Sequence, residues 1–476
     1  MTHQNGHRPH VDPRPHLPET PEALTAEALA PRPPGGIWLA ITGILLILGV
    51  VGVGMRIAGG YQDRAAWGFY AATIGFILST AQAAPLLSVA TRLTKGFWRK
   101  PLVRAAELFT VSGIINLLLL IPLLPVLPPL EGRMTFWVAW PGAPQLPLLL
   151  GMIALVVCGL GLLYTSARPD VATVLDRSGT ALRNARLGSA WPGSAGILPA
   201  GAGARRGLLT GPWLGTPHQW KVMSNAITYL GIFYLMMLVF MQFMVGVELA
   251  ISLVPGWRDP IFPAFLAISS IQAGLATLVV ALALLRAFGG YRRFIALDQF
   301  WNPAKLMMSF SMLWFYFWWS GFIIFWYGRT PPEQGVLMTV IFGPYLWPFI
   351  ASFFCNFVIP LFLLIWNPIR VSIGGPILAG VIIIFGNLMD RIRIYAGAFG
   401  VEDVTAHLVE HTPATRMPDL ADILVFIGAI GGIAFLYLLA MRFIPAVSLW
   451  ELKEGQLLTR HRSLVRSAVV VIGKPQ

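Results

Sequence analysis

The chain has 476 residues, of which 56% are hydrophobic and only 12% are charged, and its mean hydropathy is +0.69. Soluble proteins of ordinary composition carry about a quarter charged residues, so this composition excludes that class and favours an all-α polytopic membrane protein. The net charge of +13 does not indicate nucleic-acid binding, because the basic residues bracket apolar runs instead of forming one patch with aromatic residues.

Apolar runs bounded by charged residues, Pro or Gly predict about ten membrane-spanning helices. They cover approximately residues 37–58, 66–92, 103–128, 144–166, 221–250, 261–287, 303–328, 340–367, 373–396 and 420–444. The tract before the first run, residues 1–36, is rich in Pro and His and is expected to form a disordered or loosely tethered cytoplasmic tail.

Basic residues between the runs predict the orientation of the helices. The connections after the second, fourth and sixth runs hold clusters of Lys and Arg, whereas most odd-numbered connections hold about one each. By the positive-inside rule, both termini and the even connections are expected in the cytoplasm. The membrane domain would cover residues 37–446, with a Gly/Ala/Pro-rich cytoplasmic insertion at 187–213 and a cytoplasmic C-terminal tail at 447–476.

Cysteine and histidine placement argues against a metal or haem group in this chain. Cys158 and Cys355 lie far apart inside apolar runs, so they cannot supply an iron–sulfur cluster or a zinc site. All eight histidines lie outside the predicted helices, whereas a transmembrane cytochrome b needs axial ligands within the membrane. We therefore expect no metal and no covalently bound cofactor.

Charged residues near membrane depth are costly and are therefore the first functional candidates. Arg104 and Glu107 lie three residues apart at the cytoplasmic start of the third run and predict an ion pair. Glu248 ends the fifth run at the outer face, and Asp390 and Arg391 lie at the outer end of the ninth, where we expect them to tie that helix to its neighbours. Snorkelling to an interface is expected for the other arginines near helix ends, Arg56, Arg393 and Arg442.

A proton path is one hypothesis for the polar residues between the two faces. Glu107 would lie at the inner end, Glu248 and Asp390 at the outer end, and Gln242 and Gln272 between them. Isolated polar residues that satisfy helix packing are the alternative interpretation of the same pattern.

Six segments, spread over most of residues 60–450, form a recognisable set of motifs. They are "WGFYAATIGFILSTAQAAPLLSVATRL" (67–93), "WRKPLVRAAELFTVSG" (98–113), "LLYTSARPDVATVLDR" (162–177), "VELAISLVPGWRDPIFPAF" (247–265), "FIIFWYGRTPPE" (322–333) and "GNLMDRIRIY" (386–395). Together they resemble the NrfD/polysulfide-reductase family of integral membrane subunits. The P-G-W and W-Y-G segments resemble in particular the subgroup found in bacterial alternative complex III.

The resemblance implies an architecture and a set of partners. Members of the subgroup have ten helices, of which spans two to five and six to nine form two four-helix bundles and two are extra. Two such subunits work with an iron–sulfur subunit and a multihaem cytochrome c that carry the electrons of a quinol:electron-acceptor oxidoreductase in the bacterial cytoplasmic membrane. Menaquinone or another quinone would bind near the outer face, and lipids would surround the chain.

Departures from the family pattern bear on catalysis. Quinone-binding members have a histidine where this chain has Gln82, whereas Glu248, Asp390 and Arg391 match positions of the family's quinone region. Quinol oxidation needs a proton acceptor, and an amide cannot accept the proton. The resemblance therefore implies the partner subunit without a fully competent quinol site, a scaffold that is not catalytic alone and is a candidate proton conduit.

Two other functions remain open at this point. Other members of the family anchor polysulfide- or molybdenum-type reductases and bind quinone there. A secondary transporter would use Gly/Pro-interrupted helices such as residues 371–380, but the charged residues gather at the interfaces and not at the midplane.

Overall fold

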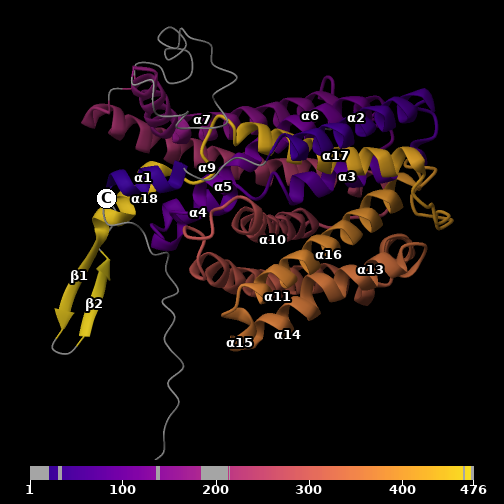
Figure 1. Ribbon diagram of the computed structural model, residues 1–476. Helices are drawn as coiled ribbons and strands as arrows, with labels where there is room; N and C mark the ends of the chain where they lie inside the picture. The colour runs from indigo at the N-terminus through magenta and orange to yellow at the C-terminus, as the bar shows by residue number, and fades with distance from the viewer. Residues whose placement is uncertain are drawn as a thin grey trace, which may run out of the picture.

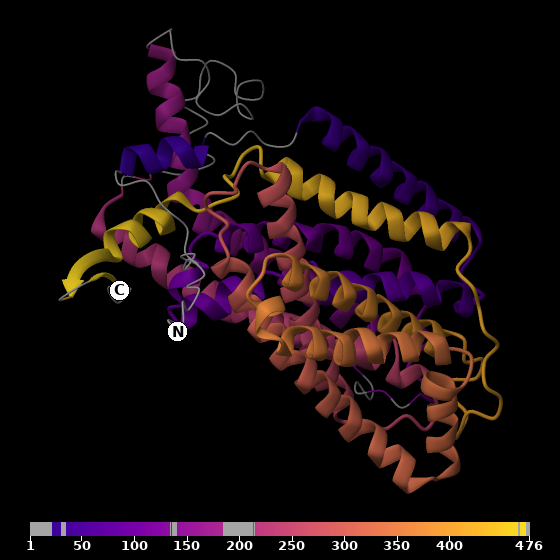
Figure 2. The ribbon, with the colours of Figure 1, turned by 60° about the horizontal axis from the view of Figure 1, so that its bottom comes forward.

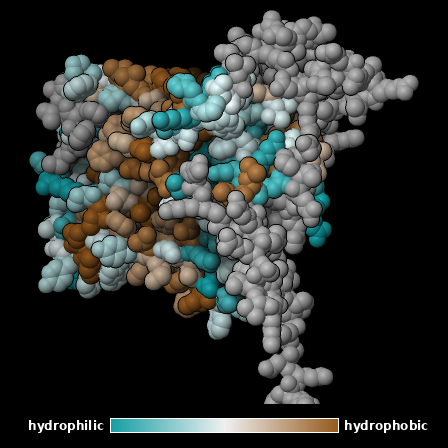
Figure 3. Space-filling model, turned by 90° about the vertical axis from the view of Figure 1, so that its left-hand side faces the viewer, coloured by the Kyte–Doolittle hydropathy of each residue, from teal (hydrophilic) through white to brown (hydrophobic). Residues whose placement is uncertain are grey.

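The computed structural model describes residues 21–29, 35–133, 135, 140–183, 213, 215–464 and 467–472. Over these residues the chain is α-helical, apart from one small antiparallel hairpin near its C-terminus (Figure 1). Eight of the described segments are long and apolar enough to cross a membrane, so the chain is a multi-pass membrane protein. On the face drawn in Figure 3, a broad hydrophobic area lies between hydrophilic residues on either side.

The eight segments agree with eight of the expected runs. They are α2 (Gly36–Ala58), the stretch from α5 (Val103–Glu107) to α6 (Ser112–Leu123), α7 (Gln145–Arg183), α9 (Pro217–Glu248), α10 (Phe262–Phe288), α11 (Asp298–Gly328), the stretch from α13 (Leu346–Phe353) to α14 (Ile359–Ile365), and α17 (Leu420–Ala440). Local signals define several starts. Asp419 and Asp422 form a capping box at α17, and the Thr216 hydroxyl caps α9 ahead of Pro217.

Two expected runs are not among the eight. Residues 66–92 divide into α3 (Gly68–Ser79) and α4 (Leu86–Leu93). The break follows Thr80, whose hydroxyl donates to the Phe76 carbonyl at 2.6 Å, and it ends at Pro85, which has no N–H for a helical hydrogen bond. The other run, 373–396, forms one continuous helix, α16 (Gly374–Phe399), whose second half carries three charged residues.

The run expected at 340–367 is also irregular. α12 (Pro331–Leu337) continues into a π-helical turn, η6 (Met338–Phe342), before α13 begins. A second π-helical turn, η7 (Phe354–Val358), separates α13 from α14, and the short α15 (Asn367–Arg370) leads into α16. π-Helical turns are rare and occur frequently at functional sites.

Neighbouring helices can be followed in Figures 1 and 2. α3 packs against α6, α6 against α7, and α7 against α9. α10 packs against α11 and α16, and α16 also contacts α3, α13 and α14. α2 and α17 lie side by side along most of their length (Figure 2), and their backbones approach so closely that a Cβ on Gly49 would lie 2.6 Å from the Cα of Gly428. Small residues at such crossings are typical of membrane helix pairs.

Parts of both expected tails are structured. α1 (Pro21–Leu29), which lies within the expected disordered tail, buries Leu24 and Ala28 and packs against α18 (Leu449–Leu458). The expected C-terminal tail contains α18 and the hairpin of β1 (Thr459–Leu464) and β2 (Ser467–Ile472). Residues 21–29 are thus helical and packed, because Leu24 and Ala28 share a buried apolar cluster with Leu449 and Leu452 of α18. The insertion predicted at 187–213, Trp213 excepted, and residues 1–20 lie outside the described part.

Candidate functional site

Asp390 is the centre of a buried charge cluster on α16. Its Oδ1 accepts a hydrogen bond from Arg393 Nε at 2.9 Å and lies 2.7 Å from Arg393 Nη2, while its Oδ2 lies 3.4 Å from Arg391 Nη1. Asp390 and Arg391 are fully buried, and Arg393 is 3% exposed. Arg393 was expected to snorkel to an interface, and that expectation was wrong because Asp390 pairs with it one helical turn away.

Arg391 connects α16 to two other helices. Its Nη2 donates to Ser269 Oγ on α10 at 3.1 Å, and its Nε lies 3.4 Å from Ser79 Oγ on α3. Asn387 bridges the same two hydroxyls, since it accepts from Ser79 at 2.7 Å and donates to Ser269 at 3.1 Å. Asp390 and Arg391 were expected to tie this helix to its neighbours, and Arg391 does so through these contacts. We call Ser79, Ser269, Asn387 and the three charged residues the Asp390 cluster.

Glu248 has a partner that the sequence did not suggest. Its Oε2 accepts from Arg133 Nη2 at 2.9 Å, and both side chains are fully buried. Arg133 also donates to Ser252 Oγ and to the Pro128 carbonyl, each at 2.9 Å. In the sequence, Arg133 is one of the single basic residues in the odd-numbered connections. Its pairing with a residue 115 positions away depends on how the loop folds over the end of α9.

Gln82 lies in the break between α3 and α4 and is enclosed by other polar and apolar groups. Asn116 Nδ2 donates to its Oε1 at 2.6 Å, and its own Nε2 lies 3.7 Å from Met152 Sδ. The Tyr234 hydroxyl donates to its backbone carbonyl at 2.5 Å. A Cβ on Gly113 would lie 2.9 Å from Gln82 Nε2, so the amide fills its space. Among the residues that the structure describes, the recorded neighbours of this amide are Asn116, Met152 and Gly113, none of which can take a proton.

The two glutamines of the expected proton path differ in their contacts. Gln272 Nε2 donates to Ser311 Oγ on α11 and to the Asn356 carbonyl in the π-helical turn η7, both at 2.8 Å. Gln242 is 1% exposed, and its Nε2 has no hydrogen-bond partner among the residues that the structure describes. Gln272 thus links α10 to α11 and to η7.

Glu107 belongs to a second buried network at the other end of the helices. The expected Arg104–Glu107 ion pair is present, with Nη1 3.3 Å from Oε2. Arg92 pairs with Glu107 Oε1, and Ser166 Oγ donates to Oε2 at 2.7 Å. Arg104 also donates to Asp170 Oδ2 on α7 at 2.9 Å. Three donors on three segments therefore converge on one buried carboxylate.

The helix α18 completes this network, which we call the Glu107 network. Glu451 is fully buried and pairs with Arg92 at 2.8 Å and with Arg99 at 3.5 Å. The Trp450 backbone N–H donates to Asp170 Oδ1 at 3.1 Å. Burial alone would raise the pKa of Glu451, but Arg92 and Arg99 outweigh burial and hold that pKa below its usual range. Sequence reasoning missed Asp170 and Glu451 because both acids lie far along the chain from their partners.

Arg56, also expected to snorkel, is another buried ion-pair residue. Its side chain is 6% exposed, and its Nη2 lies 2.6 Å from both Asp419 and Asp422 at the start of α17. The snorkelling expectation was wrong here because the close crossing of α2 and α17 brings two carboxylates to the arginine. Arg442 is half-buried.

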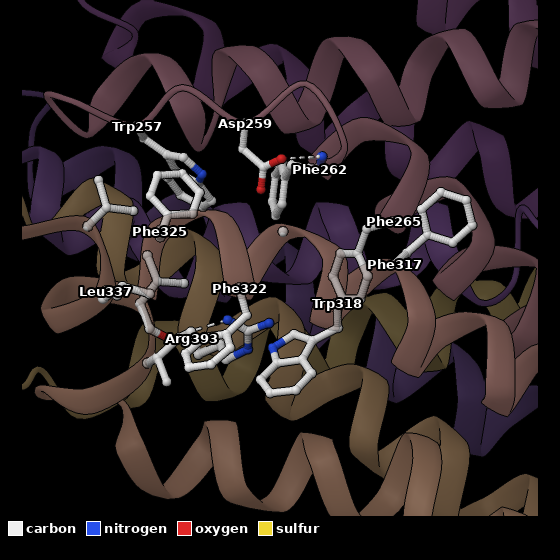
Figure 4. Close-up of a pocket in the computed structure, with 14 residues that line it drawn as sticks. Trp257, Asp259, Phe262, Phe265, Phe317, Trp318, Phe322, Phe325, Leu337 and Arg393 are labelled. Atoms are coloured by element: carbon white, nitrogen blue, oxygen red, sulfur yellow. Dashed lines mark hydrogen bonds between the residues drawn. The ribbon is translucent and has the colours of Figure 1, made fainter. Parts of the chain in front are cut away.

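A cavity lies in the second half of the chain, between α10, α11, the α12–η6 segment and α16. It has a volume of about 60 Å³, and Figure 4 shows its walls. Most lining side chains are aromatic or aliphatic, and the two charged ones are Asp259 and Arg393. The lining residues are Trp257, Asp259, Phe262, Phe265, Phe317, Trp318, Gly321, Phe322, Phe325, Val336, Leu337, Val340, Ile341 and Arg393. We call it the Asp259 cavity.

Asp259 is held in place by the start of α10. Its Oδ1 accepts from the backbone N–H groups of Ile261 at 2.9 Å and Phe262 at 3.0 Å. Its Oδ2 lies on the side of Gly321, where an added Cβ would be 3.1 Å away. Burial raises the pKa of Asp259 above its usual value, and the two backbone N–H groups only partly offset this effect.

Three of the sequence motifs meet at this cavity. The 247–265 segment supplies Trp257 and Asp259, the 322–333 segment supplies Phe322 and Phe325, and the 386–395 segment supplies Arg393. The turn that brings the first two together requires glycine. Gly256 has a φ of +82°, and a Cβ there would lie 2.6 Å from Pro332 Cβ. Sequence reasoning named none of the lining residues as a site.

Comparisons with known proteins add no identification, since no protein-family model and no curated protein matches the chain. Within the part of the chain that the structure describes, no three His, Cys, Asp or Glu side chains come together in a metal-ligating arrangement.

Proposed function

We propose that the chain is a non-haem integral membrane subunit of a bacterial quinol:electron-acceptor oxidoreductase of the alternative complex III type. The observation that best supports this proposal is that three of the family-like motifs line one cavity. A shared site would account for the occurrence of these motifs in separate segments of the chain. Iron–sulfur and multihaem subunits and a second subunit of the same type would be its partners. It would lie in the cytoplasmic membrane with both termini inside.

The proposal includes two further spans and a two-bundle arrangement. α3–α4 and α16 would also lie within the membrane, since α16 is 26 residues long and packs against α3 and α10. One bundle would contain α3–α4, α6, α7 and α9, and the other α10, α11, α13–α14 and α16, with α2 and α17 as the extra pair. The helix contacts support this grouping, because neighbours within each set pack in sequence.

A scaffolding role comes first in the proposal. The buried ion pairs at both ends, Glu107 with Arg92 and Arg104, and Glu248 with Arg133, join separate segments. Gln82 is enclosed and offers no proton acceptor, which supports the partner subunit that lacks a competent quinol site at this position.

Purification in a mild detergent tests the proposed function. The tagged full chain should bring with it subunits that contain c-type haem and iron–sulfur clusters, seen as haem absorbance and iron content in one peak with this chain. A multi-pass protein of another class with the same tag is the control. A solitary monomer or homodimer without haem and iron, in every mild detergent tried, would contradict the proposal.

Proton conduction is the secondary part of the proposal. Glu107→Gln and Glu248→Gln, each in the reconstituted complex, should slow quinol-dependent proton release while the variant complexes still assemble. Adding Gln272→Glu to either variant is not expected to restore proton release, because the Gln272 amide already donates hydrogen bonds to Ser311 and to the Asn356 carbonyl. Unchanged proton release in both glutamate variants would remove the conducting role and leave the scaffold.

A further inference from the structure

We propose that the Asp259 cavity binds the ring of a quinol or quinone, in the second half of the chain and apart from Gln82. The identity of the ligand rests on the proposed function, whereas the existence of the site rests on the cavity itself. None of the four residues expected in the quinone region lines this cavity; they are Gln82, Glu248, Asp390 and Arg391.

The walls of the cavity suit a flat apolar ring. Trp257, Phe262 and Phe325 stand on one side of the space, and Trp318 and Phe322 on the other (Figure 4). Aromatic side chains make favourable stacked and edge contacts with a ring placed between them. Pockets of this kind, mostly apolar with a few convergent polar groups, are the usual form of small-molecule sites.

Two polar groups enter from opposite sides. Asp259 comes from the α9–α10 connection and Arg393 from α16, with the aromatic walls between them (Figure 4). Asp259 Oδ1 is already used by two backbone N–H groups, which leaves Oδ2 to accept a hydrogen bond from a ligand hydroxyl. Arg393 offers N–H groups to an oxygen at the opposite edge of the ring. A quinol carries oxygens at opposite edges, as this arrangement requires.

Charge balance favours an uncharged ligand. The Arg393 guanidinium already pairs with Asp390 at 2.7 Å and donates to the Val340 carbonyl at 3.3 Å. Asp390 is shared by Arg391 and Arg393, so this cluster carries one net positive charge, and the Asp259 carboxylate across the cavity balances it. An anion would upset this balance and lie close to Asp259. A neutral ring compound satisfies both groups without burying a further charge.

Access would be from the side of α11. Phe317, Trp318 and Phe322 are each partly exposed, and the neighbouring Trp319 on the same helix is 45% exposed. A cavity of about 60 Å³ is smaller than the ~150 Å³ that holds benzene in an engineered protein cavity. A ring would thus enter as Trp318 or Phe322 turns outward into the apolar surroundings of α11.

Photolabelling of the purified full chain, with whatever subunits accompany it, tests the location. An azido-naphthoquinone should label residues 257–265 or 317–325, mapped by mass spectrometry, and unlabelled naphthoquinone should compete. Label confined to the peptides around Gln82 and Asn116 would overturn the inference. So would native mass spectrometry that finds a phospholipid in the cavity which the quinone does not displace.

Variants test the chemistry. Asp259→Asn keeps the oxygen that accepts from Ile261 and Phe262 but loses the carboxylate, and should weaken quinol binding about tenfold. Gly321→Val fills the cavity and should abolish labelling there, whereas the matched Gly54→Val, at an open position on α2, should not. Unchanged binding in both Asp259→Asn and Gly321→Val, with intact folding by melting temperature, would refute the site.

Labelling of the cavity and co-purification of other subunits are independent measurements. Labelling of the cavity in a chain that purifies without haem or clusters would support the site and refute the assembly. Co-purification of haem and clusters with a cavity that takes no label would support the assembly and refute the site.

Discussion

Gln82 in the first half of the chain and Asp259 in the second both place a polar side chain against apolar helices, yet their surroundings differ. Gln82 is 1% exposed and its amide is enclosed by Asn116, Met152 and Gly113. Asp259 keeps one carboxylate oxygen on a cavity with aromatic walls. A group that can take a proton and a cavity therefore occur together at Asp259, whereas Gln82 presents an amide to closely packed neighbours.

The Asp390 cluster connects these two halves, and breaking it should have the largest effect. Asp390→Ala would leave Arg391 and Arg393 buried without their carboxylate, at a cost of about 3–5 kcal/mol in the free energy of unfolding. Thermal unfolding in detergent measures the change. The control is Asp63→Ala, which removes an exposed partner of Arg416 and should cost about 1 kcal/mol or less. Equal effects of the two variants would show that the cluster does not stabilise the fold.

A matched pair of glycine variants tests the contrast between the enclosed amide and the open cavity. Gly113→Ala places a Cβ 2.9 Å from both Gln82 Nε2 and Val156, and should destabilise the protein by about 1–3 kcal/mol. Gly321→Ala places its Cβ 3.1 Å from Asp259 Oδ2 at the edge of a cavity, where the neighbour can yield. Its effect should be close to zero, because the gain in helix propensity of up to about 1 kcal/mol offsets the contact. The melting temperatures of the two variants decide the point, and the opposite ranking would contradict it.

Histidine substitution at Gln82 sharpens the same contrast. Gln82→His introduces a group that can take a proton, but Met152 and Gly113 already pack closely against this side chain. We expect no gain of quinone labelling near residue 82 and a loss of stability of about 1–2 kcal/mol from repacking. New label at peptides around residue 82 would show that the lack of a histidine, and not the packing, prevents quinone binding there.

The smallest expected effect is a difference in pH dependence between Asp259 and Glu451. Burial raises the pKa of Asp259 from 3.8, so its ionisation opposes folding, and stability falls as pH rises through the raised value. Asp259→Asn should therefore be more stable than the parent at neutral pH, with the gain lost at acidic pH. The pKa of Glu451 is lowered from 4.5, so its contribution is present above pH 4.5 and is lost as pH falls through the folded value. Glu451→Gln should show the opposite trend. Melting temperatures measured from pH 3 to 8 test both trends, and an equal change with pH in the two variants would contradict them.

Local rules account for the parts of the fold that the sequence predicted. Apolar length predicted all eight segments that are apolar enough to span a membrane, because the span of a helix across a bilayer depends only on consecutive residues. The Arg104–Glu107 ion pair was predicted for the same reason, since residues three apart on one helix share a face. Pro85 is a local signal for the break between α3 and α4, but the apolar run continues across it and favours one unbroken helix. Residues 21–29 can form a helix by themselves, but the Pro-rich segments on either side favour an unstructured tail.

By itself, the sequence determined a helical multi-pass membrane protein and the positions of its buried charges along the chain. Only the tertiary structure decided what those charges meet: Arg133 with Glu248, Arg56 with Asp419 and Asp422, and α18 with the Glu107 network. It also decided that Asp259 and Arg393, 134 positions apart in the sequence, face one cavity. The physical reason is that burial demands a partner for every charge, whereas the choice of partner depends on which helix faces meet, and helical periodicity does not specify that choice.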